Sequence, residues 1–129
     1  MATIPESHAD LLESDATAVF GTINPDGTPH MTPVWVGRDG DDVLVNSATG
    51  RRKVKNARRN ADAGVCVMDP EDPYRYLSAW GDIVEVTTEG AVDHIHDLSR
   101  RYTGEDYDLS GDAGERVILR LRPEDVTTW

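Results

Sequence analysis

Short apolar runs separated by turn sequences dominate the first half of the chain. The runs Thr17–Ile23, Thr28–Val36 and Asp42–Ser47 have the length of strands. Between them stand Asn24-Pro25-Asp26-Gly27 and Arg38-Asp39-Gly40-Asp41, both strong turn sequences. These segments predict a three-stranded antiparallel meander.

The second half predicts three more strands. Ala63–Met68 is short and apolar, and Tyr74–Thr88 is long enough for a strand bent at Gly81. Arg116–Leu121 alternates polar and apolar positions, as a half-buried strand does. The two prolines of residues 69–73 predict an irregular loop before the long strand.

Three segments show helical signals. Thr3 is placed as the N-cap of a short helix that runs to about Glu13. The arginine-rich segment after Gly50 predicts a second helix with a sparse apolar stripe. The spacing of Ala91, Ile95, Leu98 and Tyr102 predicts an amphipathic third helix, followed by a Gly- and Asp-rich loop over 103–114.

Together these elements predict one mainly β domain over residues 1–129, an antiparallel barrel of about six strands. A single cysteine, Cys66, excludes an intrachain disulfide framework, so a cytoplasmic protein is expected. No segment has the apolar length of a membrane span, and the N-terminus lacks the order of a signal peptide.

The chain carries 13 basic and 24 acidic residues, a net charge of −11, which argues against nucleic acid as a partner. Sixteen aspartates stand against two lysines, Lys53 and Lys55. That ratio is typical either of a surface adapted to high salt or of an acidic protein from an organism that prefers arginine codons.

Six of the 13 basic residues lie in one segment, Arg51–Arg59, which contains no acidic residue and is called the basic segment below. One interpretation is a solvated helix face, which most charge runs are. The other is an anion site at a helix start, because a small, polar turn precedes the segment. In that case Ser47 and Thr49 would offer hydroxyls, and the backbone N–H groups near Gly50 and Arg51 would point at the anion.

Few other residues suggest chemistry. His94 and His96 lie two apart on a predicted helix and so point to different faces, and His8 and His30 have no companion at ligand spacing, so no metal site is expected. Cys66 lies within an apolar strand, where cysteine behaves as a small hydrophobe. If the chain is an enzyme, a bound cofactor is expected to supply the reactivity.

Five segments in order resemble one superfamily. They are Asp26–Trp35, Ser47–Asn56, Asp69–Tyr76, Glu89–Gly104 and Gly114–Leu121. In this order they resemble the pyridoxamine-phosphate-oxidase-like split β-barrels, and within them the flavin/deazaflavin oxidoreductases of the B group, described as F420-dependent enzymes. The resemblance covers nearly the full length and implies an FMN-binding split-barrel fold.

The resemblance also implies site residues. The cofactor phosphate would be held by Arg51, Arg52 and Lys53, with Ser47, Thr49 and Gly50 beside them. The ring would lie along the second strand, here Met31 to Val36, with Thr32, Pro33 and Val34 as the binding residues. A second protomer would complete the pocket with Tyr74, Arg75 and Tyr76. Asn56, Lys55 and Arg59 would meet a longer anionic tail. The oxidases themselves carry an arginine and a lysine where this chain has roughly Thr32 and Gly37, which argues against pyridoxine chemistry.

The leading hypothesis is therefore a homodimeric reductase that passes a hydride from reduced F420 to a small conjugated or heteroaromatic acceptor. Tyr76 is the candidate proton donor. The charge of the basic segment favours F420 over FMN, because an oligoglutamate tail adds carboxylates to the phosphate. The alternatives are an FMN-dependent oxidoreductase on the same barrel and a non-catalytic flavin- or F420-binding protein.

Overall fold

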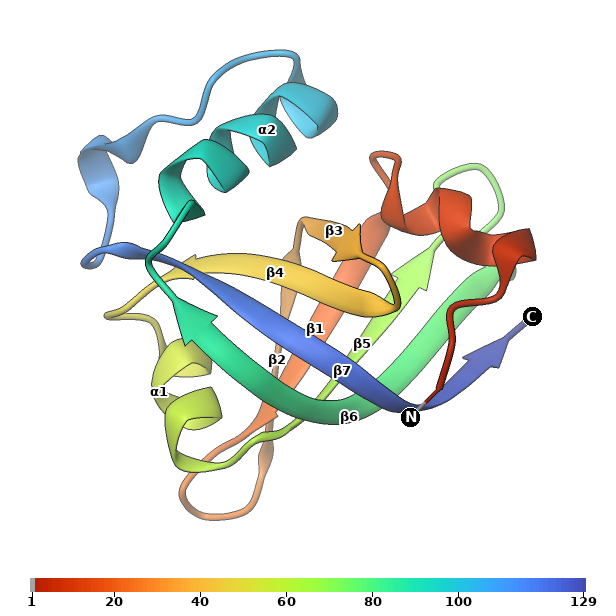
Figure 1. Cartoon of the computed structure of the whole chain (residues 1–129), viewed down its shortest axis with the longest axis horizontal. Helices are drawn as coiled ribbons and strands as arrows, with labels where there is room; N and C mark the ends of the chain where they lie inside the picture. The colour runs from red at the N-terminus through yellow and green to blue at the C-terminus, as the bar shows by residue number, and fades with distance from the viewer. Residues whose placement is uncertain (1) are drawn as a thin grey trace.

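Seven strands form one antiparallel sheet in the computed structural model, which describes residues 2–129 (Figure 1). They are β1 (Thr17–Ile23), β2 (Pro29–Val34), β3 (Val36–Asp39), β4 (Asp42–Ala48), β5 (Asp62–Met68), β6 (Tyr76–Thr87) and β7 (Arg116–Thr128). The predicted mainly β architecture is confirmed. The predicted count of about six strands is one short, because Trp35 interrupts the run Thr28–Val36 and divides it into β2 and β3.

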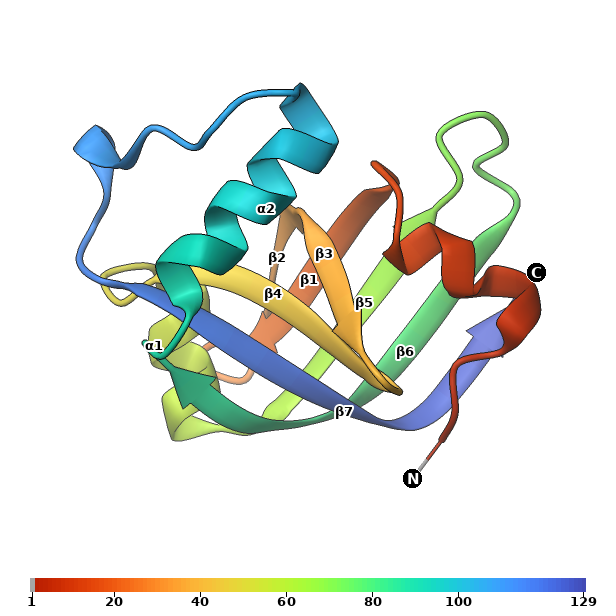
Figure 2. The same cartoon turned by 45° about the horizontal axis from the view of Figure 1, so that its top comes forward.

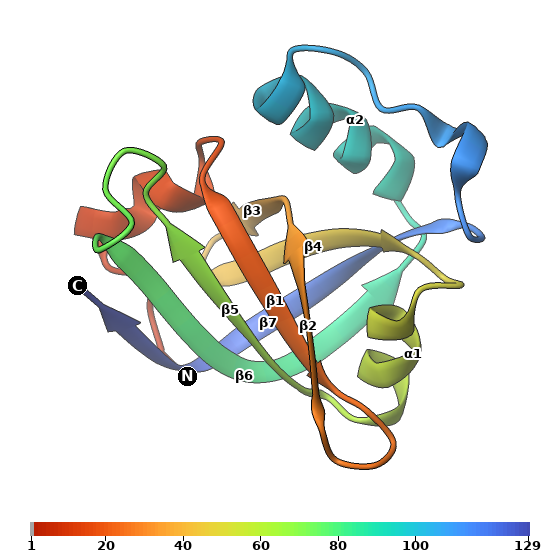
Figure 3. The same cartoon turned by 180° about the vertical axis from the view of Figure 1, so that it is seen from behind.

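The strand order explains the split in the barrel. It is β2-β1-β5-β6-β7-β4-β3, so the two edge strands, β2 and β3, are consecutive in the chain with Trp35 alone between them. The sheet curls round until its two edges come close, as Figures 1 and 3 show. The barrel is thus closed by hydrogen bonds everywhere except at the seam marked by Trp35.

Alternating side chains fill the barrel. The inward positions of the strands carry fully buried apolar residues, among them Phe20, Val45, Val67, Leu77 and Leu119. This period of two follows from the pleat, which sends successive side chains to opposite faces of a sheet. The same alternation places polar or small residues on the outer face. The exceptions are parts of that face that lie under other segments of the chain or carry apolar patches.

Two α-helices and two 3₁₀ helices complete the fold: α1 (Arg52–Arg59), α2 (Ala91–Thr103), η1 (Glu6–Leu12) and η2 (Leu109–Gly111). In Figure 2 α2 lies over β4 and the start of β7, while α1 lies at one end of the barrel. The predicted stripe of α2 is confirmed, since Ala91, Ile95 and Leu98 are buried. No helix within residues 2–129 has the length and apolar character needed to cross a membrane.

The predicted N-terminal cap is wrong. The first helix is a 3₁₀ helix that begins at Glu6, Pro5 precedes it in an extended conformation, and no side chain caps it. The backbone N–H of Ile4 instead donates to Asp41 Oδ1 at 3.0 Å. A contact distant in sequence therefore replaces the local capping box that the pattern favoured.

The bend predicted at Gly81 is confirmed by a register shift between Trp80 and Gly81 in the pairing of β6 with β7. A Cβ at Gly81 would lie 2.1 Å from the carbonyl oxygen of Arg122, so the two backbones can approach only at a glycine. The last strand runs past the predicted end, Leu121, to Thr128. Pro123 and the charged residues around it hide this extension, because they break the alternation of the sequence pattern.

Candidate functional site

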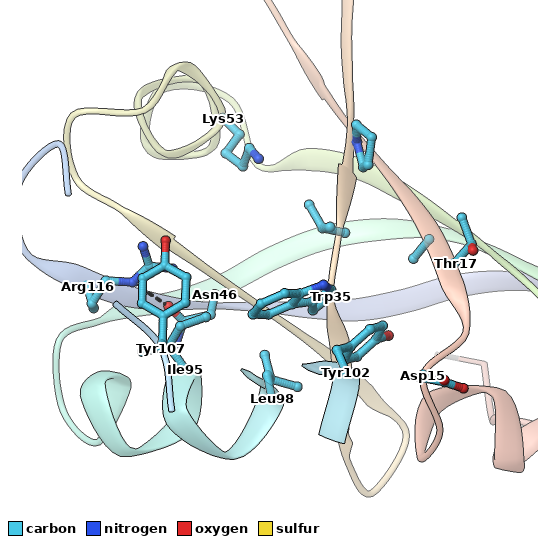
Figure 4. Close-up of a pocket in the computed structure, with 13 residues that line it drawn as sticks. Asp15, Thr17, Trp35, Asn46, Lys53, Ile95, Leu98, Tyr102, Tyr107 and Arg116 are labelled. Carbon is cyan, nitrogen blue, oxygen red and sulfur yellow. Dashed lines mark hydrogen bonds between the residues drawn. The ribbon is translucent and has the colours of Figure 1, made fainter. Parts of the chain in front are cut away.

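A pocket of about 350 Å³ opens at the seam of the barrel. It is lined from β1, β2, β4, α1, α2 and β7 and from the segment between α2 and β7, as Figure 4 shows. Its lining residues are Asp15, Thr17, Ala18, Pro33, Val34, Trp35, Asn46, Lys53, Ile95, Leu98, Tyr102, Tyr107 and Arg116. Three of these, Pro33, Val34 and Lys53, were predicted from the sequence as cofactor-binding residues.

One wall of this seam pocket is aromatic. Trp35 stacks on Tyr102, with ring centroids 5.3 Å apart and an interplanar angle of 19°, and meets Tyr107 edge-on at 6.1 Å. The Tyr102 hydroxyl donates to the Ala16 carbonyl at 2.8 Å and accepts from the Val36 N–H at 3.3 Å, and burial raises the pKa of Tyr102. A fixed aromatic surface of this kind suits a planar ring.

Two cations face the pocket from different elements. Lys53 comes from α1, and its pKa is lowered by burial and then by the charges of Arg51 and Arg116. Arg116 comes from the start of β7, where its side chain is only 7% exposed and bonds Asp112 Oδ1 at 3.1 Å. An anion placed beside Lys53 and Arg116 would offset the burial and the neighbouring charges that disfavour the protonated form of Lys53.

Arg116 is held in place by a network of polar side chains. Its Nε donates to Asn46 Oδ1 at 2.9 Å, and the Asn46 amide nitrogen donates to the Ala91 carbonyl and to His94 Nδ1, both at 2.9 Å. His94 is therefore an acceptor at Nδ1, and burial is the main reason why its pKa is lowered. The network orients the guanidinium before any ligand arrives.

The cations of the basic segment differ from the other cations of the chain in having few hydrogen-bond partners. Outside it, each of the seven arginines hydrogen-bonds a carboxylate or a backbone carbonyl within residues 2–129, as with Arg75 on Asp10 and Asp69 or Arg101 on Val36. Inside it, Arg59 alone has such a partner in that range. The remaining five, Arg51, Arg52, Lys53, Lys55 and Arg58, are free to meet a ligand.

The predicted backbone cradle before α1 is wrong in detail. The N–H of Gly50 donates to the Ala113 carbonyl at 2.5 Å and that of Arg51 to the Ala48 carbonyl at 2.9 Å, so neither faces an anion. The turn is closed because it packs against the segment that leads into β7, which also receives the Thr49 N–H at the Glu115 carbonyl. The N–H groups of Arg52 and Lys53, one position further, have no acceptor within residues 2–129.

The inner face of β2 carries two unsatisfied polar atoms. His30, Thr32 and Val34 alternate on this face, and His30 Nδ1 and Thr32 Oγ1 are buried without a hydrogen-bond partner among the described residues. His30 and Arg52 also line a second pocket of about 540 Å³. Neighbouring residues of β2 and α1 thus line the two pockets. Along β2, Thr32 lies between His30 of the second pocket and Val34 of the seam pocket.

Ser47 and Asn56 are placed away from the pocket. Ser47 is buried on β4 and, by strand alternation, its side chain lies on the opposite face from Asn46, which does line the pocket. Asn56 is fully buried and its amide donates to Thr22 Oγ1 at 3.1 Å and Asn24 Oδ1 at 2.9 Å. Asn56 therefore ties α1 to the β1–β2 hairpin.

Tyr74 and Tyr76 do not meet the other predicted site residues within one chain. They lie in the β5–β6 connection and at the start of β6, at the opposite end of the sheet from α1 in Figure 1. Tyr74 is 79% exposed. A second copy of the chain would have to bring them to the pocket.

The lining residues that sequence reasoning missed include Asn46, Tyr107 and Arg116. No signal separates Arg116 from the other arginines, because its role depends on pairing with Asn46 across 70 positions. Within residues 2–129 no group of three histidine, cysteine or acidic residues is arranged to hold a metal ion. Cys66 is half-buried, and burial raises the pKa of its thiol, so it is poorly suited to act as a nucleophile.

An apolar groove of about 370 Å³ crosses the outer face of the sheet. In register across four strands lie Met31, Gly21, Gly64 and Trp80, so two glycines form the floor and two large side chains the walls. Met31 is 66% exposed and Trp80 is 60% exposed. Figure 3 shows that no helix covers this part of the sheet.

The fold and the seam pocket can now be compared with known proteins. The family model described as pyridoxamine 5′-phosphate oxidase matches residues 4–129. The chain belongs to this family. No curated protein sequence matches the chain.

Solved structures agree with the family assignment. A structure titled F420 reductase is 31% identical, with a TM-score of 0.84, and the match covers 96% of this chain and 98% of that one. The conserved hypothetical protein Rv2991 of Mycobacterium tuberculosis is 24% identical, with a TM-score of 0.77 over 98% of this chain and 85% of that one. HupZ of group A Streptococcus is 17% identical, with a TM-score of 0.71 over 98% and 94%. The last two show the shared fold alone.

Proposed function

We propose that the protein is an F420-dependent reductase that binds the deazaflavin cofactor in the seam pocket. The observation that carries this proposal is the pairing of Lys53 and Arg116 beside the aromatic wall of Trp35 and Tyr107, a donor set for a planar ring that bears an anion. The likeness to the F420 reductase structure supports it. The acceptor would be a small conjugated or heteroaromatic molecule.

The residues present fit such a cofactor. Thr32 Oγ1 is a buried hydroxyl without a partner, and the N–H groups of Arg52 and Lys53 are free, so several polar groups on β2 and α1 need a ligand. Val34 and Lys53 line the seam pocket, while His30 and Arg52 line the second pocket. A long anionic ligand can therefore follow the same two elements, which favours F420 with its tail over FMN.

Reduced F420 supplies a hydride when bound, and the protein's part is to bind, orient and shield. Lys53 and Arg116 would hold the phosphate, and Trp35 would offer its aromatic face to the ring. Tyr107 is a pocket group that holds a transferable proton and has no acceptor for it among residues 2–129. It replaces Tyr76 as the first candidate to protonate the acceptor, unless a second copy brings Tyr76 to the pocket.

We also propose that two copies associate through the apolar groove on the outer face. Met31 and Trp80 expose apolar surface on a flat glycine floor, and the large side chain of one copy can fill the glycine groove of the other. Pro33, which lines the seam pocket, lies on the same outer face of β2 as Met31. A dimer of this kind would place the second copy beside the pocket mouth.

Titration with F420 and, separately, with FMN tests the cofactor choice, with quenching of tryptophan fluorescence as the signal. Tighter binding of F420 is expected, because its tail adds carboxylates that reach Arg52. Tighter binding of FMN would favour the FMN-dependent alternative. Oxidation of reduced F420 across a panel of acceptors then separates a reductase from a protein that only carries the cofactor.

A further inference from the structure

The segment between α2 and β7 contributes Tyr107 to the seam pocket and is anchored near its two ends. Asp106 pairs with Arg100, and the carbonyls of Ala113 and Glu115 accept from the N–H groups of Gly50 and Thr49. Of residues 104–115, only Tyr107 and Asp112 are not exposed, and none belongs to the hydrophobic core. Gly104 and Gly114, near its two ends, have φ values of 85° and 110°, which other residues rarely adopt. Figures 1 and 2 show the segment as an arch that leaves the end of α2 and returns to the start of β7.

Both of its inward residues meet the same pocket cation. The Arg116 guanidinium lies 4.9 Å from the centroid of the Tyr107 ring, and its Nη1 donates to Asp112 Oδ1 at 3.1 Å. The side chains of Arg116 and Asp112 are 7% and 11% exposed, so their ion pair is largely shielded from water. The Tyr107 N–H adds one bond to His96 Nδ1 at 3.1 Å on α2.

We propose that residues 107–112, between these anchors, form a lid over the seam pocket, latched shut by Asp112 and Tyr107 on Arg116, and that this latch limits the entry of an anionic ligand. The anion of the ligand and the Asp112 carboxylate compete for the same guanidinium, so an anion that binds Arg116 weakens its contact with Asp112. The effect on ligand entry rests on the proposed function, whereas the lid itself does not.

Limited digestion with chymotrypsin reads the lid without a ligand. The bond after Tyr107 is followed by mass spectrometry against the bond after Tyr74, which is exposed and distant from the lid. Asp112→Asn should speed the cut at Tyr107 relative to the cut at Tyr74 by about tenfold, because the loss of the ion pair with Arg116 raises the population of the open segment. Glu105→Gln is the matched control, because Glu105 lies in the same segment, is exposed and forms no ion pair within residues 2–129.

Stopped-flow association of F420, or of FMN if that binds more tightly, reads the latch. Asp112→Asn and Tyr107→Ala should both raise the association rate several-fold, while Glu105→Gln should match the wild type. If Asp112→Asn and Glu105→Gln behave alike in both experiments, the lid is overturned. If neither ligand binds the wild type, the proposed function fails, and the digestion still decides whether the lid exists.

Discussion

Lys53 on α1 and Arg116 on β7 are separated by more than sixty positions in the sequence, yet both face the seam pocket, and the charge of Arg116 helps to lower the pKa of Lys53. Arg116 already binds Asp112, whereas Lys53 forms no ion pair within residues 2–129. The pocket therefore holds one unpaired ammonium group, that of Lys53, in a molecule of net charge −11.

Lys53→Ala should weaken the binding of F420 by about 2 kcal/mol, roughly thirtyfold, because a charge-assisted contact to the anion is lost. Arg58→Ala is the control: Arg58 is an equally unpaired cation of α1 but does not line the pocket. Isothermal titration of both variants measures the difference. Equal losses would mean that α1 acts through its general charge and not through a defined contact.

The affinity for F420 should fall as the pH rises through the lowered pKa of Lys53. Below that pKa the ammonium is present and attracts the anion, and above it the neutral amine does not. The folding stability of the protein without ligand should instead rise with pH, between the lowered pKa of Lys53 and the usual range of a lysine. Burial disfavours the protonated form of Lys53 in the folded state, so its deprotonation removes that cost. Lys53→Arg should remove the pH dependence of binding on the alkaline side, as fluorescence titrations at several pH values would show.

Trp35 should report the arrival of the ligand. Its ring forms the pocket wall with Tyr102, whereas Trp129 is 75% exposed at the C-terminus. Trp35→Phe is expected to abolish most of the quenching by F420, and Trp129→Phe to leave it. Quenching that survives in Trp35→Phe would place the ligand elsewhere.

Trp80→Asp should convert a dimer to a monomer, because it puts a charge in the middle of the apolar groove. Val92→Asp is the control, since Val92 is 45% exposed on α2, away from that groove. Sedimentation velocity distinguishes the species. A wild type that sediments as a monomer would remove the proposed interface altogether.

Asp42→Asn should reduce the free energy of unfolding by about 2 kcal/mol, because Asp42 is a buried carboxylate whose partners Arg120 and Arg122 would lose their shared anion. Asp39→Asn, which removes an exposed partner of Arg120, should cost about 0.5 kcal/mol. The hydrogen bond from Arg122 is the main cause that lowers the pKa of Asp42. The stabilisation that the Asp42 carboxylate contributes is therefore present above the usual pKa range of a carboxyl and is lost as the pH falls through the lowered pKa. Urea unfolding at neutral and acidic pH checks both statements.

The sequence pattern predicted the parts of the fold that depend on local alternation. The strands around Phe20, Val45 and Val67 have the expected period, and the apolar stripe of α2 at Ile95 and Leu98 is where its spacing places it. The missed features depend on distant partners. Trp35 separates β2 from β3, which are the two edges of the sheet. The extension of β7 beyond Leu121 depends on its pairing with β6 across a bulge.

The same limit applies to the candidate site. Lys53 stands out in the sequence because its segment is basic, and it does line the pocket. Arg116 and Asn46 could not be found this way, because their meeting depends on the pairing of β4 with β7. Asn56 lies in the basic segment but fills a structural position against Thr22, which charge patterning cannot reveal.

The two free edges of the sheet belong to consecutive strands, so the barrel lacks one row of main-chain pairing and holds its pocket in that place. On the proposed function, the cofactor binds in this gap, between β2 and the elements beyond Trp35, and so stabilises the folded chain. The cofactor concentration and the lifetime of the protein would then be linked, since a molecule without cofactor opens first at the seam and is the form that proteases cleave.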